Sequence, residues 1–192
     1  PPTPDAPKPS TPVVAAPAPL DLSPVPEPAD VVGLVRWTNP ASTLSALTSC
    51  AGLPPQLSET GTRVVVEGIL DELLPGSIEP KQLAPLVALD APMFGVVALD
   101  PTSKRGKPFA AIAVGLTSLE AARGAVEAAG APAEIAPGMW KIGGKERSQT
   151  SCVIAASAGS TPARLVCADR DRDLTALASY LTRTLPSAPP EG

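Results

Sequence analysis

Proline occupies 11 of the first 28 positions of this chain, from Pro1 to Pro28. Because proline fixes φ near about −65° and has no backbone N–H, such a stretch forms neither a helix nor an inner strand. We therefore expect residues 1–29 to be an extended tail or linker of the polyproline II type, which acts as a semi-rigid spacer. The alternative is a leader without a role of its own. Residues 186–192 are also rich in proline, so the sequence predicts a single domain over residues 30–185 between two proline-rich ends.

Composition limits the partners of this domain. The net charge is −4, and no cluster of Lys and Arg forms a basic stripe, so we expect no nucleic-acid partner. No apolar run approaches the roughly 20 residues that a membrane-spanning helix needs, so we expect no membrane span in this chain. Aromatic residues make up only 3% of the sequence, and the core must therefore consist of small aliphatic side chains.

Hydrophobic periodicity predicts a mixed α and β domain. In the first half we expect a strand over Val31–Trp37, a helix over Ala41–Cys50 capped by Asn39 or a following Ser, and a helix over Thr62–Leu74. Residues 78–89 are ambiguous and could form a further short helix.

The second half has a clearer pattern. Ser118 is expected to cap the helix Leu119–Ala129. The expected strands are Met93–Leu99, Phe109–Val114, Met139–Ile142, Cys152–Ser157 and Ala163–Cys167, and a last helix covers Leu174–Leu185. The order ββαβββα indicates an α+β fold of ferredoxin-like type, in which helices pack on one face of an antiparallel sheet.

Two cysteines lie at the ends of a predicted hairpin. Cys152 and Cys167 flank a turn signal at Gly159-Ser160, and a two-residue loop there makes residues face each other when their numbers add up to about 319. The two thiols would then be cross-strand neighbours, at a spacing that suits a disulfide. Two alternatives remain open: both are buried free thiols, or Cys50 bridges to one of them.

The sequence lacks the residues of the commonest active sites. It contains no histidine, which removes Ser-His-Asp and Cys-His catalysis and histidine-based metal sites. Its three cysteines have no C-x-x-C spacing, and neither G-x-G-x-x-G nor G-x-x-x-x-G-K-[ST] occurs. We therefore expect no cofactor and no metal, and we favour a binding protein over an enzyme.

Several polar and aromatic groups are candidate sites. The cationic turn of Lys104, Arg105 and Lys107 is a possible contact with an anionic surface, although solvated charges are the commoner outcome. The remaining groups are expected to be structural or solvated: the Asp169–Asp173 run, the pair Trp37 and Trp140, and the carboxylates Glu67, Asp71 and Glu72.

The chain resembles a group of bacterial proteins in its overall layout. A proline-rich leader, a strand followed by the Asn39-Pro40 helix start, and the SCVIAASAG…ARLVC hairpin before a last helix are similar to uncharacterised exported or lipoprotein-type proteins of GC-rich bacteria. The resemblance implies export from the cytoplasm. It transfers no catalytic residues.

Together these features predict a non-enzymatic binding or structural module outside the cytoplasm, in the periplasm or at the cell surface. Its partner would be a protein or an envelope component within a larger assembly. The tail would dock or tether it, with contacts from Pro1, Pro2, Pro4, Pro7, Pro9 and Pro12. The alternatives are a hydrolase that uses carboxylates or a serine without histidine, and an inhibitor or chaperone-like domain that adds a client strand at a sheet edge.

Overall fold

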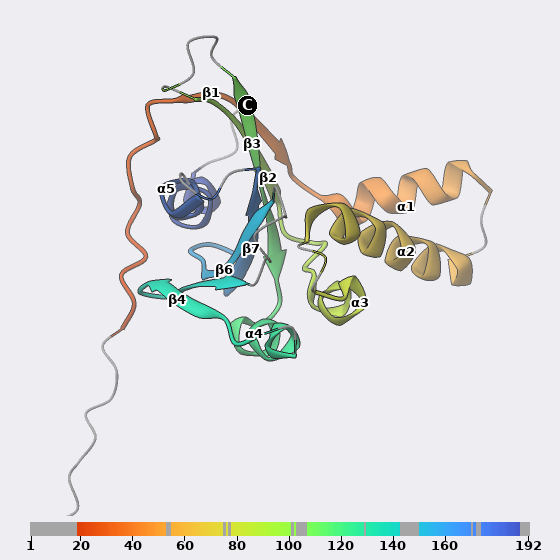
Figure 1. Cartoon of the computed structure of the whole chain (residues 1–192). Helices are drawn as coiled ribbons and strands as arrows, with labels where there is room; N and C mark the ends of the chain where they lie inside the picture. Colours follow the sequence, from red (N-terminus) through yellow and green to blue (C-terminus); the bar gives the residue numbers. More distant parts are fainter. Residues whose placement is uncertain are drawn as a thin grey trace, which may run out of the picture.

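A single antiparallel sheet of seven strands organises the described part of the chain, in the order β1-β2-β3-β7-β6-β5-β4 (Figure 1). The structure is a computed structural model. It describes residues 19–52, 55–74, 76, 78–100, 102, 107–128, 130–142, 150–169, 171 and 174–188, with the backbone alone for residues 48 and 55–59.

The described chain contains the following strands and helices. The strands are β1 (Val31–Trp37), β2 (Met93–Leu99), β3 (Pro108–Leu116), β4 (Ala133–Ala136), β5 (Met139–Ile142), β6 (Ser151–Ala156) and β7 (Ala163–Ala168). The helices are α1 (Pro40–Cys50), α2 (Pro55–Leu73), α3 (Pro80–Leu83) with the 3-10 turn η1 (Ala84–Leu86), α4 (Leu119–Glu127) and α5 (Leu174–Ser179), which continues into the π-helical turn η2 (Tyr180–Thr184) and the 3-10 turn η3 (Leu185–Ser187).

The predicted α+β class and antiparallel sheet are confirmed. Both predicted helix starts hold: the Ser42 N–H donates to Asn39 Oδ1 at 2.9 Å, and the Ala121 N–H donates to Ser118 Oγ at 3.1 Å. The second half contains one strand more than expected, β4, whose AEIA sequence is largely exposed and has no apolar alternation. Helix α2 begins at Pro55, seven residues earlier than its apolar stripe indicated.

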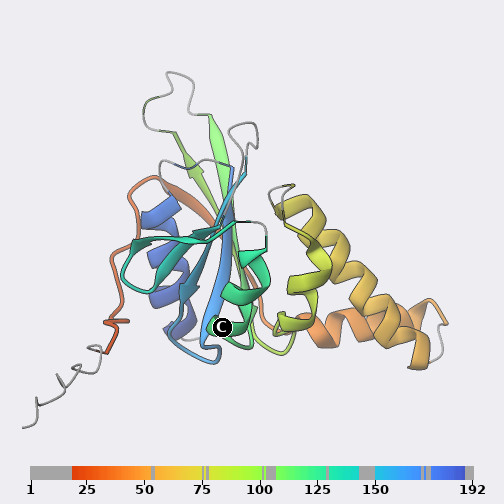
Figure 2. The same ribbon diagram turned by 60° about the horizontal axis from the view of Figure 1, so that its bottom comes forward.

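Helices cover both faces of the sheet, whereas we expected them on one. Helix α5 and the turn η2 pack on one face, against the buried side chains of β2, β3, β6 and β7. Helices α2, α3 and α4 pack on the other face, against β3, β5, β6 and β7. Figure 2 shows the sheet between these two layers. The physical reason is that β6 and β7 are apolar at every position except Ser151 and Arg164 and are buried at every position except Ser151, so both of their faces need cover.

The cysteine hairpin has the predicted register. Cys152 pairs with Cys167 and Ile154 with Leu165, and the two sulfurs form a disulfide with 4.1 Å between the Cα atoms. The connection is longer than the expected two residues, because the Ser157 N–H to Pro162 carbonyl bond closes a four-residue loop. The longer loop adds one residue to each side of the expected two-residue loop, so the facing residues still have numbers that add up to 319 and the register is unchanged. Cys50 is an exposed free thiol.

The disulfide gives a measurable prediction. Unfolded protein without reductant should titrate one thiol, Cys50, and three thiols after reduction. Replacing both bridged cysteines by alanine should lower the free energy of unfolding by about 3 kcal/mol, because a loop of this length is closed in the unfolded chain. Urea unfolding of the double variant measures this loss, with Cys50→Ala as the control. Three thiols without reductant would contradict the bridge.

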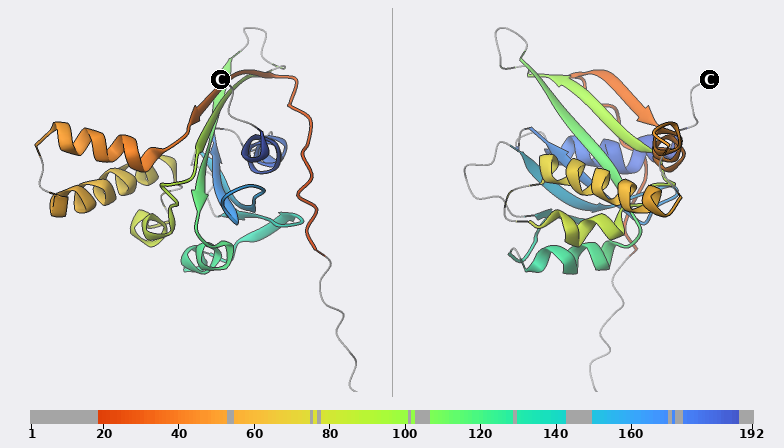
Figure 3. Two further views of the ribbon diagram at one scale, coloured as in Figure 1. Left: turned by 180° about the vertical axis from the view of Figure 1, so that it is seen from behind. Right: turned by 90° about the vertical axis from the view of Figure 1, so that its right-hand side faces the viewer.

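A strap precedes the first strand. Residues 19–29, which composition assigns to the tail, lie along α5 and η2 before the chain enters β1 (Figures 1 and 3). Val25 exchanges two hydrogen bonds with Thr184 Oγ1, at 2.9 and 2.7 Å, and Tyr180 Oη donates to Glu27 at 2.5 Å. At its start the strap reaches the β4–β5 turn, where Gly138 has φ of 74° and a Cβ would lie 2.8 Å from a Leu20 methyl carbon. Glycine is therefore required there twice over.

The buried guanidinium of Arg164 on the α5 face joins β7 to β2, to the loop before β2 and to the loop after β6. Arg164 of β7 is 0% exposed; it donates to the Pro92 carbonyl at 2.7 Å and to Ser157 Oγ at 3.2 Å, and its guanidinium lies 4.7 Å from the Phe94 ring centre. Burial, and then the charge of Arg36, lower the pKa of Arg164 to about 10. The side chain is still protonated at neutral pH, so the charge is held inside the domain by a ring and two oxygens.

Two substitutions of Arg164 should separate the effect of its buried charge on stability from the effect of its guanidinium geometry. Arg164→Lys should lower the free energy of unfolding by roughly 3 kcal/mol, because an ammonium stays buried without the fork that reaches both acceptors. Arg164→Met should cost less, because it removes the buried charge together with the hydrogen bonds. Urea unfolding of both variants measures the order. A lysine variant as stable as the original protein would contradict the role of the fork.

Candidate functional site

One region of the α2 face of the sheet is left largely open by the described helices. The core on this face contains no residue of β1 or β2. Side chains of these two strands and of β3 that point to this face are exposed, with Val35 at 66%, Val97 at 39% and Ile112 at 38%. Strand pairing places Val35 opposite Gly95 and Gly95 opposite Ile112, so the exposed side chains are neighbours. The right-hand view in Figure 3 shows β1, β2 and β3 extending beyond the helices that cover the rest of this face.

An apolar groove, which we call the β1 groove, lies over these strands. Its volume is about 380 Å³. It is lined by Val35, Trp37, Ile69, Met93, Phe94, Gly95, Val96, Val97, Ala110, Ala111, Ile112 and Val114. No charged residue is among them, and the only side-chain donor in this set is the Trp37 indole. A site of this size without polar anchors can bind apolar groups but cannot orient or activate a polar substrate.

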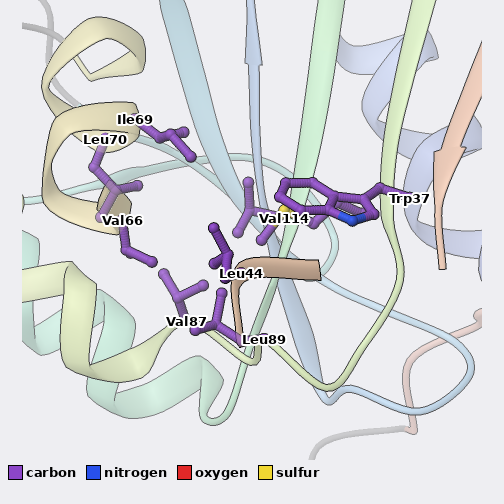
Figure 4. A pocket seen from close by; sticks show the side chains of 9 residues that line it. Trp37, Leu44, Val66, Ile69, Leu70, Val87, Leu89 and Val114 are labelled. Atoms are coloured by element: carbon purple, nitrogen blue, oxygen red, sulfur yellow. The ribbon is translucent and has the colours of Figure 1, made fainter. Parts of the chain in front are cut away.

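Trp37 forms the inner end of the groove. Its indole Nε1 donates to Thr43 Oγ1 of α1 at 2.9 Å, which fixes the ring between the sheet and the α1–α2 hairpin. Beneath it lies a second cavity of about 10 Å³, which has room for roughly one water-sized probe. Side chains from α1, α2 and β3 converge on this cavity, among them Leu44, Leu70 and Val114 (Figure 4). Trp37 lines both spaces, together with Ile69, Met93 and Val114, so these four side chains form the boundary between the small cavity and the open groove.

Gly95 leaves the floor of the β1 groove without a side chain. A Cβ at this position would meet Val35 Cβ at 3.8 Å and the Ala111 carbonyl oxygen at 4.0 Å, which are ordinary van der Waals distances. Its φ is not positive, so other residues can adopt this backbone. The glycine is therefore not needed for the backbone itself, and a larger side chain there would fill the groove.

The outer wall of the groove is an edge strand. In the described residues β1 pairs with β2 alone, so its other edge presents backbone N–H and C=O groups. Val32, Leu34 and Val35 are exposed along it, at 60%, 47% and 66%. Edge strands are usually protected by lysine, proline or a cover. The VVGLVRW sequence of β1 contains neither lysine nor proline, and Arg36 is its one charged residue.

The sequence-predicted contact residues are not part of this groove. Lys107 is exposed at the base of the β2–β3 hairpin, where its carbonyl accepts from the Asp100 N–H at 3.0 Å. The other positions lie outside the described residues: Lys104, Arg105, Pro1, Pro2, Pro4, Pro7, Pro9 and Pro12. Their roles as contacts stay predictions.

The acidic and aromatic candidates have structural partners. Asp171 forms an ion pair with Lys141 at 2.6 Å, and Asp169 accepts from the Ala110 N–H at 3.1 Å. Trp140 lies under Arg123, 4.3 Å from the guanidinium carbon to the ring centre. Trp37 and Trp140 point to the same face of the sheet but are separated by the four strands between β1 and β5, so they form no common platform.

No catalytic cluster emerges in the described residues. Asp71 and Glu72 are exposed on α2 and Glu67 is half-buried, and none of the three lines the β1 groove. Across the described ranges, no three residues among Asp, Glu, Cys and His gather in a way that could hold a metal ion. Within the same ranges no helix combines the length and the apolar character needed to cross a bilayer.

Sequence reasoning missed the β1 groove because each of its residues reads as an ordinary core residue. The available signal was β1 itself, which is apolar at both odd and even positions, as a strand covered on both faces would be. Comparisons with protein-family models, with curated proteins and with solved structures found no match to this chain.

The β1 groove should bind an uncharged apolar dye. N-phenyl-1-naphthylamine fluorescence should rise on binding, with energy transfer from Trp37 in the groove wall. Gly95→Val should weaken binding by about ten-fold because the new side chain occupies the floor. Gly124→Ala on α4, where an added Cβ meets nothing within 4 Å, is the control. Equal dye binding by both variants would show that the dye sits elsewhere.

Proposed function

We propose that this protein is a non-enzymatic binding module that takes up an extended apolar segment of a partner protein at β1. The observation that carries the proposal is the coincidence of two features: an edge strand whose second edge has no partner among the described residues, and an apolar groove of about 380 Å³ whose wall is that same strand. A strand added to β1 satisfies the backbone groups of the edge. Its alternate side chains then point into the groove, next to Val35 and Trp37.

The chemistry of the groove favours small or β-branched side chains in the partner. The floor at Gly95 is shallow, and the walls are valine, isoleucine, methionine and alanine. Specificity would come from shape and from the backbone ladder, since the lining offers no charge. This is the sheet-edge mode expected among the alternatives from sequence, and it agrees with the non-enzymatic role.

We further propose that the module works outside the cytoplasm, in an envelope or secreted assembly. The buried Cys152–Cys167 disulfide supports this location, because structural disulfides persist in oxidising compartments. The proline-rich tail would hold the domain at a distance from its anchor.

A peptide library displayed on phage tests the binding mode. Selection on the full chain should enrich extended peptides with alternating Val, Ile or Ala and without proline in the central run. Hydrogen exchange should then show protection of the Val31–Trp37 amides in the complex, because these amides gain partners at the free edge.

Two variants serve as matched tests of location. Val97→Glu places a charge in the β1 groove and should weaken the selected peptides by at least about ten-fold. Ile135→Glu places the same charge on β4, the other edge of the sheet, where Ile135 is also exposed, at 40%, and should leave binding unchanged. Selected peptides that bind both variants equally, or that protect β4 rather than β1, would refute the proposed mode.

A further inference from the structure

The N-terminal tail contains one segment that matches the β1 groove. Between Pro12 and Pro17 the chain reads Val13-Val14-Ala15-Ala16, and this is the longest run without proline in residues 1–18. It can therefore offer four consecutive backbone N–H groups, which no other part of residues 1–18 can do. Its side chains are β-branched or small, which are the kinds that the shallow apolar groove accepts.

We propose that residues 13–16 of one copy of this chain add as a strand to β1 of a second copy, with alternate side chains in its β1 groove. This inference rests on the proposed function and names its partner. The alternate apolar side chains would pack beside Val35, Gly95 and Val97, and the backbone would pair with the free edge of β1.

The segment cannot reach the groove of its own molecule. Leu20 packs at Gly138, in the turn between β4 and β5, and β5 is five strand positions away from β1 in the sheet order. At about 4.8 Å per strand this separation is roughly 24 Å. Ala16 precedes Leu20 by four residues, which span at most about 14 Å when fully extended. The strap also runs on the α5 side of the sheet (Figure 3), whereas the groove opens on the α2 side.

The other end of the described chain does not compete for the edge. Ala188 lies near β1, because its carbonyl accepts from Arg36 Nη1 at 3.2 Å. The next two residues, Pro189 and Pro190, have no N–H to donate. A strand that pairs with β1 needs several consecutive backbone N–H groups, and residues 13–16 of a second copy supply them.

The resulting contact joins two different surfaces, a tail and a groove. Such a heterologous contact closes into a ring or a reciprocal pair when geometry allows, and otherwise extends into a chain of molecules. Self-association should therefore depend on concentration and on both surfaces.

Sedimentation of the full chain tests the inference, in a Cys50→Ser background that prevents bridges between exposed thiols. The chain should self-associate. Val13→Asp/Val14→Asp should raise the dissociation constant of this association by at least about ten-fold, and Gly95→Val should do the same. Ser10→Asp/Thr11→Asp adds the same two charges just outside the segment and should leave association unchanged. A chain that stays monomeric up to about 1 mM, or an association that ignores Val13 and Val14, overturns the inference.

A second measurement separates this inference from the proposed function. The synthetic peptide Ser-Thr-Pro-Val-Val-Ala-Ala-Pro-Ala, residues 10–18, should bind to the Val13→Asp/Val14→Asp chain and protect the amides of Val31–Trp37 from hydrogen exchange. If library peptides bind at β1 and this peptide does not, the tail inference is wrong and the proposed function stands. If neither binds, both are wrong.

Discussion

One register decides which side of the sheet each side chain occupies, and the Cys152–Cys167 pair holds that register at the centre of the molecule. Strand pairing continues the row from Cys167 through Ile112 and Gly95 to Val35. The disulfide and the β1 groove are therefore two parts of one row on one face. A slip of one residue between β6 and β7 would turn every side chain of β6 to the opposite face relative to β7 and would separate the two cysteines.

The two faces of the sheet are covered by helices to different extents. On one face α5 closes the core completely enough to bury Arg164, whose Nε and Nη1 donate to two oxygens and whose guanidinium lies by Phe94, while its Nη2 is buried without a hydrogen-bond partner. On the other face the helices extend over β3, β5, β6 and β7 but leave β1 and β2 open. The α1–α2 hairpin projects away from the sheet instead of lying across it (Figure 1). Its departure from the sheet leaves the groove open, while Trp37, Ile69, Met93 and Val114 form the boundary between the groove and the core cavity behind it.

Local signals in the sequence predicted individual elements well. Strands β1, β2 and β5 have the expected bounds, and both helix caps and the disulfide are confirmed. Strand β4 was missed because its alanines and exposed side chains give no period. The burial of Arg164 was not predicted, because its partners Pro92, Ser157 and Phe94 come from other segments of the chain. The groove was out of reach for the same reason: whether a strand face is covered depends on where distant helices pack, and periodicity carries no information on that.

The strap also determines how the domain responds to force. A tail that leaves the domain at residue 19 is separated from β1 by the contacts of Leu20, Val25 and Glu27. Two of these contacts lie on the turn η2, at Thr184 and Tyr180, and the third lies at Gly138 between β4 and β5, so tension on the tail meets two separate elements of the domain. Tension reaches the β1–β2 ladder only after the strap has come away. An assembly linked through such tails could therefore bear tension while its sheets, and the grooves built on them, keep their shape.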